Sequence, residues 1–473
     1  MDRAKVHSLI DRDSEELIST IREIVAIPSV DGTPEEGAPF GRGPKNALDK
    51  FVEIGKRLGF RAWAFDDQVG ILEYGDESLP EMVAVLAHVD VVPPGDGWSC
   101  DPWEGMVKDG LLYGRGVADD KGPAISSVYA LKALREAGVA FKRRVRVLVG
   151  TNEEKGSKAV AHYVESGQEV CVAGFTPDSA FPVTNGEKGI VGATCYAPFK
   201  ADGGSVRVVS IDAGLAANAV PERAVAVIKV SPEAEKRVLR AVSDFAAPRD
   251  AKLACEKTGE CEYTLTMDGL SFHGSVPQYG SNAAAHLVKV MRLMGIGGEQ
   301  GEFLAKIDNL IGEQTRGENL GIMLYDDVAG FSSLCWGILK TEGERVKFTV
   351  NYRFPVTFSA DDVAPKVEKA LKSQGFDMDP LRVSAPLYMP EDCELVQKLM
   401  KVYRDETGDM DSTPLCVGGG TYAKEMPNML AFGNQFVGEN CHIHEADERW
   451  SVEHIIEHTK IMAAAIAALA EEA

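Results

Sequence analysis

The sequence MVAVLAHVDVV, residues 82–92, is a nearly continuous apolar run that only His88 and Asp90 interrupt. Such a run is typical of a strand that is buried on both faces of its sheet. Residues 144–150 form a second run of this kind. Residues 123–138, with a proline near the start and a glycine at the end, predict a helix between the two strands. Buried strands that alternate with helices predict an α/β fold with helices on both faces of the sheet.

The pattern changes near residue 185, where apolar and polar residues begin to alternate. With predicted helices at 232–246 and 360–373, this alternation is typical of an α+β domain with a largely antiparallel sheet. After residue 388 the strand–helix alternation returns. We therefore predict a discontinuous α/β domain, residues 1–186 and 389–473, into which an α+β domain, residues 187–388, is inserted. The alternating segments are SVRVVSIDAG (205–214), RAVAVIKVS (223–231), CEYTLTMDGLSFHG (261–274) and RVKFTVNYRFP (345–355).

The charge and composition of the chain limit its partners. Its 473 residues include 72 Asp and Glu but 50 Lys and Arg, a formal net charge of -22, so most of the surface should repel nucleic acid. The first residues lack the apolar core of a signal peptide, and the late apolar run at 461–470 is too short to span a bilayer. The nine cysteines form no CxxC pair, which favours reduced thiols. We expect a cytoplasmic protein without a nucleic-acid or membrane partner.

Polar residues follow the predicted buried strands. His88 and Asp90, two residues apart, would point to the same face of their strand, and a carboxylate is a usual partner of a metal-bound imidazole. A lone buried histidine, however, is more often a satisfied core residue. Glu153 and Glu154 come just after the strand at 144–150, where capping of a following helix is the alternative explanation. Because ligands bind at the carboxyl ends of strands in open α/β sheets, we expect all four side chains at one edge.

Further carboxylates and histidines extend this set. Asp119 and Asp120 stand side by side in the segment GVADDKGP, a turn that by itself would be explained as a solvated loop. Asp178 follows another short apolar run, and His442 and His444 lie near the end of the chain. Histidine and carboxylate groups without cysteine suit zinc, cobalt or manganese. Two cations about 3.5–4 Å apart would relieve the repulsion within such an acidic cluster and supply a nucleophile at neutral pH.

Five short segments carry a resemblance to a known family. In chain order they resemble the metal-site motifs of the co-catalytic di-zinc peptidases, which include carboxypeptidase G, the succinyl-diaminopimelate desuccinylases and the carnosinases. The resemblance covers residues from about 80 to 450, and five motifs in the family's order are far more specific than any single one. It implies a catalytic domain with a mixed central sheet and an inserted lid domain. The segments are HVDVVPPG (88–95), GRGVADDKGP (114–123), TNEEKGS (151–157), PDSAFP (177–182) and IHEADE (443–448).

The resemblance implies two zinc ions, for which cobalt or manganese could substitute. His88 and Asp178 would bind one ion, Glu154 and His444 would bind the other, and Asp119 would bridge the two. All five of these positions lie in the matching motifs.

Other residues of the motifs would support the metals. Asp90 would orient the first histidine ligand, and Glu153 would be the general base that deprotonates the attacking water. In relatives the peptide bond after the bridging aspartate is cis, so Asp120 would support the turn without binding a metal. His442 would be a bystander, because the family's last histidine precedes a pattern that fits His444.

The inserted domain would supply contacts to the substrate. By resemblance, His273 would stabilise the oxyanion, with Asn218 nearby. Arg353 would bind the substrate's terminal carboxylate through a bidentate fork, although a surface salt bridge is the alternative for an arginine taken alone. Backbone N–H groups of a glycine-rich segment could add contacts, because glycine allows close approach. The residues of that segment assigned to substrate binding are Gly419, Gly420 and Thr421.

These roles predict a metallopeptidase that hydrolyses dipeptides with a free N-terminus and acts as a monomer that uses its own His273. The alternative among enzymes is an aminoacylase or desuccinylase that uses the same metals on an N-acyl amino acid. An alternative of another class is a catalytically silent metal- or peptide-binding protein. The presence of Glu153 together with every ligand position argues against a silent binder, which would not need a general base.

Overall fold

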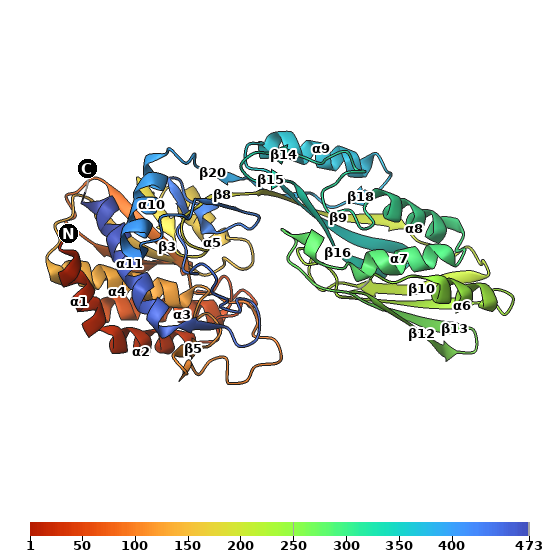
Figure 1. Ribbon diagram of the computed structural model, residues 1–473, viewed down its shortest axis with the longest axis horizontal. Coiled ribbons are helices and arrows are strands. Elements are labelled where there is room, and N and C mark those ends of the chain that lie inside the picture. The colour runs from red at the N-terminus through yellow and green to blue at the C-terminus, as the bar shows by residue number, and fades with distance from the viewer. Residues whose placement is uncertain (249, 472–473) are drawn as a thin grey trace. The chain divides into compact units, whose positions relative to one another are not determined.

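The computed structural model describes residues 1–248 and 250–471, and the chain divides into two compact units (Figure 1). The chain leaves unit 1 for unit 2 and later returns. The predicted domain boundaries near residues 186 and 388 stay a proposal. The segments are Met1–Asn185, Met389–Leu415 and Gly420–Ala473 for unit 1, and Gly186–Tyr388 and Cys416–Gly419 for unit 2.

The main sheet of unit 1 is mixed. Strand β3 is parallel to both β6 and β7, and β22 is parallel to β7. Strands β1, β2 and β8 run antiparallel to their neighbours. Every residue of β3 is buried, as expected for a central strand. The strands in spatial order are β1 (Arg61–Phe65), β2 (Val69–Tyr74), β6 (Arg144–Gly150), β3 (Met82–His88), β7 (Ala173–Thr176), β22 (Met429–Ala431) and β8 (Thr184–Glu187).

Helices pack on both faces of this sheet, as predicted. Helix α5 (Lys158–Glu165) lies on the face of Arg146, whose guanidinium donates to the Tyr163 hydroxyl at 3.0 Å. A larger layer covers the other face, where Val145 and Val147 join the main core. The helices of that layer are α1 (Arg3–Arg12), α2 (Ser14–Val25), α3 (Arg42–Arg57), α4 (Lys121–Ala137), α10 (Glu394–Thr407) and α11 (Val452–Ala470).

Helix α4 anchors the turn of the paired aspartates. It begins directly after Asp120, and it packs against α1, α2 and α11. It ends at Gly138, whose φ of 80° is the left-handed conformation that glycine adopts readily at helix C-termini. In residues 1–248 and 250–471, no helix is both long and apolar enough to cross a membrane.

Unit 2 contains a sheet in which all paired strands are antiparallel, as predicted from the alternating pattern. The residues of β13, for example, alternate between more and less buried positions. The strands in spatial order are β12 (Lys252–Gly259), β13 (Glu262–Asp268), β11 (Arg223–Val230), β10 (Val206–Ala213), β16 (Ser333–Glu342), β17 (Arg345–Phe354), β9 (Gly189–Pro198) and β18 (Asp377–Met378), and β19 (Arg382–Ser384) also pairs with β9.

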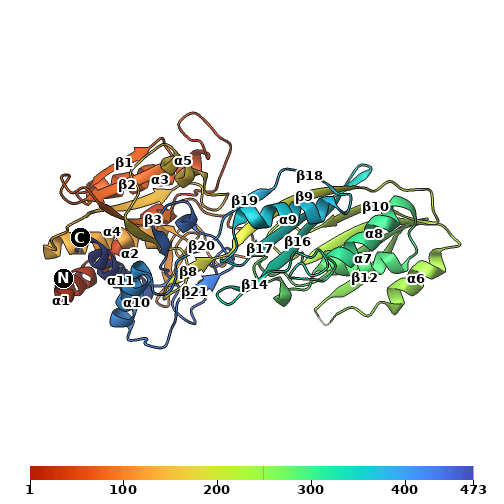
Figure 2. The same ribbon diagram turned by 90° about the horizontal axis from the view of Figure 1, so that it is seen from above.

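Helices of unit 2 lie along its sheet (Figure 2). Residues of four helices and of the sheet form a second core. Leu265, Trp336 and Phe348 contribute to it from three different strands. The predicted fold class, an α/β domain with a mixed sheet and an α+β domain with an antiparallel sheet, is therefore confirmed. The helices are α6 (Glu235–Asp244), α7 (Ala283–Leu293), α8 (Gly298–Leu310) and α9 (Ala360–Lys372).

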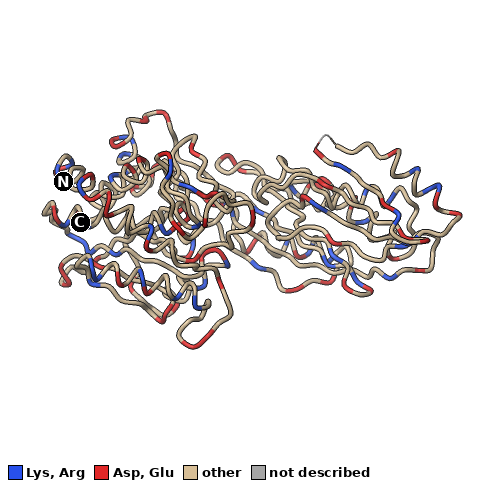
Figure 3. The backbone as a smooth tube through the Cα atoms, turned by 90° about the horizontal axis from the view of Figure 1, so that it is seen from below, with Lys and Arg blue, Asp and Glu red and all other residues tan. Residues whose placement is uncertain are grey.

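Acidic residues are spread along both units (Figure 3).

Short elements complete both units. In unit 1, β23 pairs with β5, and β5 pairs with β4. This small sheet joins the segment before Asp119 to the segment after His444. The short elements are β4 (Met106–Lys108), β5 (Leu111–Tyr113), β23 (Arg449–Ser451), β14 (Tyr325–Asp326), β15 (Gly330–Phe331), β20 (Leu387–Tyr388), β21 (Leu415–Val417), η1 (Pro277–Tyr279) and η2 (Tyr422–Lys424).

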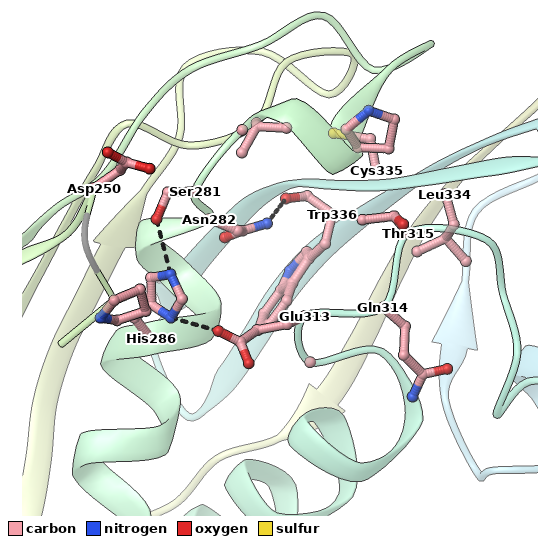
Figure 4. A pocket seen from close by; sticks show the side chains of 15 residues that line it. Asp250, Ser281, Asn282, His286, Glu313, Gln314, Thr315, Leu334, Cys335 and Trp336 are labelled. Atoms are coloured by element: carbon pink, nitrogen blue, oxygen red, sulfur yellow. Dashed lines mark hydrogen bonds and ion pairs between the residues drawn. The ribbon is translucent and has the colours of Figure 1, made fainter. Parts of the chain in front are cut away.

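A pocket of about 210 Å³ lies within unit 2, beside the start of α7 (Figure 4). Its wall carries a chain of polar contacts. Ser281 Oγ lies 3.0 Å from His286 Nε2, and His286 Nδ1 lies 2.9 Å from a carboxylate oxygen of Glu313. These contacts tie the first turns of α7 to the segment that follows α8.

Candidate metal centre

Three parallel strands of unit 1 end at the same edge of the sheet. In the order β6, β3, β7, their carboxyl ends deliver Glu153 and Glu154, His88, and Asp178. Ligands bind at this edge in open α/β sheets. The strand pattern and the sheet order thus explain why residues far apart in the sequence gather there.

Asp119 lies between two histidines. Its Oδ1 is 2.9 Å from His88 Nε2, and its Oδ2 is 3.0 Å from His444 Nε2. His444 Nε2 is also 3.1 Å from Glu154 Oε1, and His88 Nε2 is 3.8 Å from Asp178 Oδ2. Each oxygen of one carboxylate therefore faces a different histidine, which is the arrangement that a bridging ligand needs.

Among residues 1–248 and 250–471, two groups of side chains are close enough to hold an ion. One contains His88, Glu153 and Asp178, and the other contains His88, Asp119 and Glu154. Within each group, one potential ligand atom per residue lies within 4.8 Å of the others. Glu153, expected from the resemblance to act as a base, belongs to the first of these groups.

The electrostatics of this cluster suit cations. Burial raises the pKa of Glu153 well above its ordinary value, and the neighbouring Asp178 raises it further. Burial and the charge of Asp119 raise the pKa of Asp178 to about 7 and also raise that of Glu154. Hydrogen bonds from His444 and His88 outweigh burial at Asp119 and lower its pKa. Crowded carboxylates with imidazole nitrogens among them match the N and O ligands of a divalent metal such as zinc, which would compensate their negative charge.

Asp90 has more contacts than the sequence predicted. His88 Nδ1 lies 3.0 Å from the backbone carbonyl of Asp90 and 3.6 Å from its carboxylate. The two carboxylate oxygens of Asp90 instead accept the backbone N–H groups of Glu153 and Glu154, at 3.1 Å each. The predicted orienting role stays a proposal, and the structure adds a second contact, to the backbone of the glutamate pair.

Asp120 supports the neighbouring strand. Its Oδ2 accepts the backbone N–H of His88 at 3.1 Å, and the Asp119–Asp120 peptide bond is cis. Its side chain is fully buried, and burial followed by the charge of Asp178 raises its pKa. His442 lies in a separate contact, in which its Nε2 is 2.8 Å from an Arg449 nitrogen.

Tyr422 also contacts this edge, which the sequence analysis missed. Its hydroxyl accepts the backbone N–H of Asn152 at 3.1 Å, next to the glutamate pair, and its ring packs edge-on against His88. It directly follows Thr421, whose hydroxyl accepts the N–H of Ala423 at 3.2 Å and caps η2. A tyrosine next to a glycine-rich segment has no metal-site signature, so only the fold identifies it.

Unit 2 brings three of its predicted substrate residues together. Arg353 is buried, and its guanidinium contacts Asn351 Oδ1 at 2.9 Å, the carbonyl of Gly418, and His273 Nε2 at 3.2 Å. Asn218 lies beside His273, because its carbonyl accepts the N–H of Gly274 at 2.6 Å and Ala219 forms a β-bridge with His273. Of the remaining predicted residues, Gly419 belongs to unit 2, whereas Gly420 and Thr421 belong to unit 1.

The environment of Arg353 differs from that of a surface salt bridge. Its three partners named above include no carboxylate, and burial lowers the pKa of the guanidinium to about 10. Among the described residues, the partners named for this buried guanidinium are two neutral oxygen atoms and an imidazole nitrogen, and an arginine in such surroundings is suited to an anionic ligand.

Residues 84–468 match the peptidase family M20/M25/M40. The chain belongs to this family. The Bacillus subtilis (strain 168) protein named "Putative dipeptidase YtjP" is 34% identical over 466 residues, which cover 97% of this chain and 98% of that protein. The Staphylococcus haemolyticus (strain JCSC1435) protein named "Putative dipeptidase SH1171" is 32% identical over 465 residues, covering 97% of each chain.

Solved structures share the fold at lower sequence identity. Human carnosine dipeptidase 1 is 16% identical with a TM-score of 0.59, covering 99% of this chain and 100% of that chain. The dipeptidase Dug1p from Saccharomyces cerevisiae is 15% identical, also with a TM-score of 0.59, covering 100% of this chain and 99% of that chain. The resemblance predicted from the five motifs is thus confirmed. The chain is a peptidase of a metal-dependent family, and the clustered residues could hold the metal.

Proposed function

We propose that this peptidase is a dipeptidase similar to the bacterial dipeptidase PepV and that it uses two zinc ions. The observation that carries the two-metal part is the position of Asp119, whose two oxygens lie within 3.0 Å of two different histidines. The names of the relatives support the dipeptide substrate. The cytoplasmic location and the monomeric state expected from the sequence stay predictions.

We assign the metal ligands as the resemblance suggests. His88 and Asp178 would hold one ion, Glu154 and His444 the other, and Asp119 both. When bound, the two cations supply a nucleophilic water at neutral pH and polarise the scissile carbonyl. Asp90 and Asp120 hold the segments that carry these ligands, through the backbone N–H groups described above.

Glu153 is proposed to move the proton. It would take a proton from the attacking water and return it to the leaving amine nitrogen. Its surroundings support this role, because burial and the nearby carboxylate of Asp178 raise its pKa well above the ordinary value of a glutamate, which makes the carboxylate a stronger base. Its backbone is fixed by Asp90, so the carboxylate starts from a defined position.

Residues of unit 2 are proposed to bind the substrate. His273 and Asn218 would donate hydrogen bonds to the oxyanion, and Arg353 would bind the terminal carboxylate. The contact between Arg353 and His273 supports a joint role, because the two side chains are fixed relative to each other within unit 2. Backbone N–H groups of Gly419, Gly420 and Thr421 would add further contacts.

A substrate panel tests this function. Purified protein, stripped of metal and then reloaded with zinc, should hydrolyse unblocked dipeptides, whereas the stripped form should not. N-acetyl amino acids and tripeptides should be cleaved much more slowly. Faster cleavage of N-acyl amino acids would establish the aminoacylase alternative instead. Zinc binding without turnover of any substrate would indicate the silent binder.

A further inference from the structure

Glu448 is a fully buried carboxylate next to the metal centre, four residues after His444. One of its oxygens accepts the backbone N–H groups of Ala118 and Asp119, at 3.0 and 3.2 Å. The other accepts the N–H of Gly116 at 3.0 Å and a guanidinium N–H of Arg115 at 2.7 Å. All four donors therefore belong to the segment that ends at Asp119.

Arg115 connects its own segment to the segment that carries His444. It is also buried, and its second terminal nitrogen donates to the carbonyl of Glu445 at 3.1 Å and to that of Pro94 at 3.3 Å. Its guanidinium lies 5.3 Å from the ring centre of Trp98. Arg115 thus binds the residue directly after His444, while Glu448 binds the segment before Asp119.

The pairing of β5 with β23 places these two segments side by side. Leu112 is opposite Trp450, and just beyond the strands the N–H of Gly114 donates to the backbone carbonyl of Glu448 at 3.0 Å. The strand pairing aligns the backbones, and the two charged side chains then fix the turns that follow. Charge-assisted hydrogen bonds of this kind are stronger than neutral ones. Because they already fix the segments that carry Asp119 and His444, these segments lose less conformational freedom when a metal binds.

We propose that Arg115 and Glu448 form a latch that holds Asp119 and His444 in register and so preorganises the metal position that these two residues share. The proposal rests on the two-metal site proposed above. The two residues are positioning residues, because they act through the backbone of the ligands. His88, a ligand of the other position, has its own supports, in the backbone carbonyl of Asp90 and the carboxylate of Asp120. Loss of the latch should therefore weaken one metal position more than the other.

The substitution Glu448→Gln tests the latch with little change in shape. A glutamine has a single acceptor oxygen, and its NH₂ group would face N–H donors. Glu73→Gln is the matched control. Glu73 is 5% exposed and pairs with Arg146 at 2.6 Å within unit 1, but it lies on β2 and its partners lie on β1 and β6. The substitution Glu73→Gln thus removes a similar buried ion pair in which no proposed metal ligand takes part.

The measurement is zinc binding to metal-free protein by competition with a chromophoric chelator, together with ion counts after dialysis against buffered zinc. Outer-sphere partners of metal ligands are typically worth about 10–100-fold in metal affinity. In Glu448→Gln we expect the affinity for one of the two zinc ions to fall by a factor in this range, and the number of ions per chain after dialysis to fall toward one. Glu73→Gln should bind zinc like the wild type. Arg115→Lys keeps the charge but loses the fork, so it should show a smaller loss of the same ion. If Glu448→Gln does not fold, zinc binding to Arg115→Lys tests the latch.

Two results would overturn the latch. One is wild-type zinc affinity in both Glu448→Gln and Arg115→Lys. The other is an equal loss in Glu73→Gln, which would mean that any weakened fold binds metal poorly. A wild-type protein that binds fewer than two ions would contradict the proposed two-metal function instead, and the latch would then be judged on the ion that remains.

Discussion

Glu153 and Glu154 are adjacent, yet the proposed mechanism gives them different tasks. Both backbones are held by Asp90, at equal distances. Their side chains differ in surroundings, because Glu154 Oε1 lies 3.1 Å from His444 Nε2 whereas Glu153 groups with His88 and Asp178. At the scale of the residue, replacing each glutamate by glutamine distinguishes a residue that transfers a proton from one that binds a metal.

We expect Glu153→Gln to keep both zinc ions and a near-normal KM while kcat falls. General-base catalysis is typically worth about 10²–10⁴-fold, so the loss in kcat should reach at least that range. Glu154→Gln should instead lower the number of zinc ions per chain. Elemental analysis and steady-state kinetics on the same preparations would check both. Opposite behaviour of the two variants would show that the roles are exchanged.

Sequence patterns predicted that these histidine and carboxylate residues would gather at one edge of the sheet, but not how each is held. The carboxyl ends of β3, β6 and β7 meet because buried strands and connecting helices dictate a parallel arrangement. The support that Asp90 gives to the glutamate pair could not be predicted, because its partners are backbone N–H groups, which carry no sequence signal. The same reason hides the contacts of Glu448, a residue of the motif IHEADE, whose partners are mostly backbone groups.

At the scale of the element, long periodic segments were predicted well. The strand expected at 144–150 is β6 with the same bounds, and the helix expected at 360–373 is α9 within one residue. The helix expected at 232–246 is shorter by a few residues at each end. Elements of three residues, such as β5 and β23, have too few positions for a period to show, and their pairing joins distant parts of the chain.

Strand β6 ends at Gly150, a position where a larger residue would not fit. A Cβ atom at this position would overlap the hydroxyl and ring of the buried Tyr422. Tyr422 in turn accepts the N–H of Asn152, so the two elements β6 and η2 are packed directly under the glutamate pair. Because the packing between Gly150 and Tyr422 is close, neither residue can shift far to make room for an added methyl group.

Gly150→Ala should therefore lower the free energy of unfolding by about 1–3 kcal/mol, the usual effect of overpacking. Gly32→Ala is a control in the same unit, since Gly32 is exposed and a Cβ there would come no closer than 3.6 Å to another atom, Gly41 Cα. It should change stability by less than about 0.5 kcal/mol. Urea unfolding of the metal-free proteins, followed by fluorescence, would measure both. Equal stability of the two variants would contradict the packing argument.

At the scale of the whole molecule, the change in hydrophobic pattern near residue 185 predicted that the chain contains two architectures, and the domain boundary at that point stays a proposal. The two fold classes followed because continuous apolar strands and alternating strands bury their faces differently. The return of four residues, Cys416–Gly419, to unit 2 was not predicted. A segment this short has no periodicity, and its assignment depends on contacts such as the one between Arg353 and the Gly418 carbonyl.

Substrate length is the property that the proposed role of Arg353 decides. If Arg353 binds the terminal carboxylate, substrates with one residue after the scissile bond should be preferred. A hydrogen bond to a charged group contributes about 1.5–3 kcal/mol, and each 1.4 kcal/mol is a factor of ten. C-terminally amidated dipeptides should therefore lose at least about tenfold in kcat/KM relative to the free acids.

Variants at Arg353 test whether this side chain carries the preference. Arg353→Ala should remove the difference between acid and amide substrates, and Arg353→Lys should restore little of it, because a lysine lacks the planar fork. Arg345→Ala is the matched control on the same strand, where Arg345 is exposed and pairs with Glu342. It should keep the full preference, because a surface ion pair contributes little and Arg345 is given no part in binding the carboxylate. Equal cleavage of acids and amides by the wild-type enzyme would remove the role assigned to Arg353, and with it the physical reason for a preference for dipeptides.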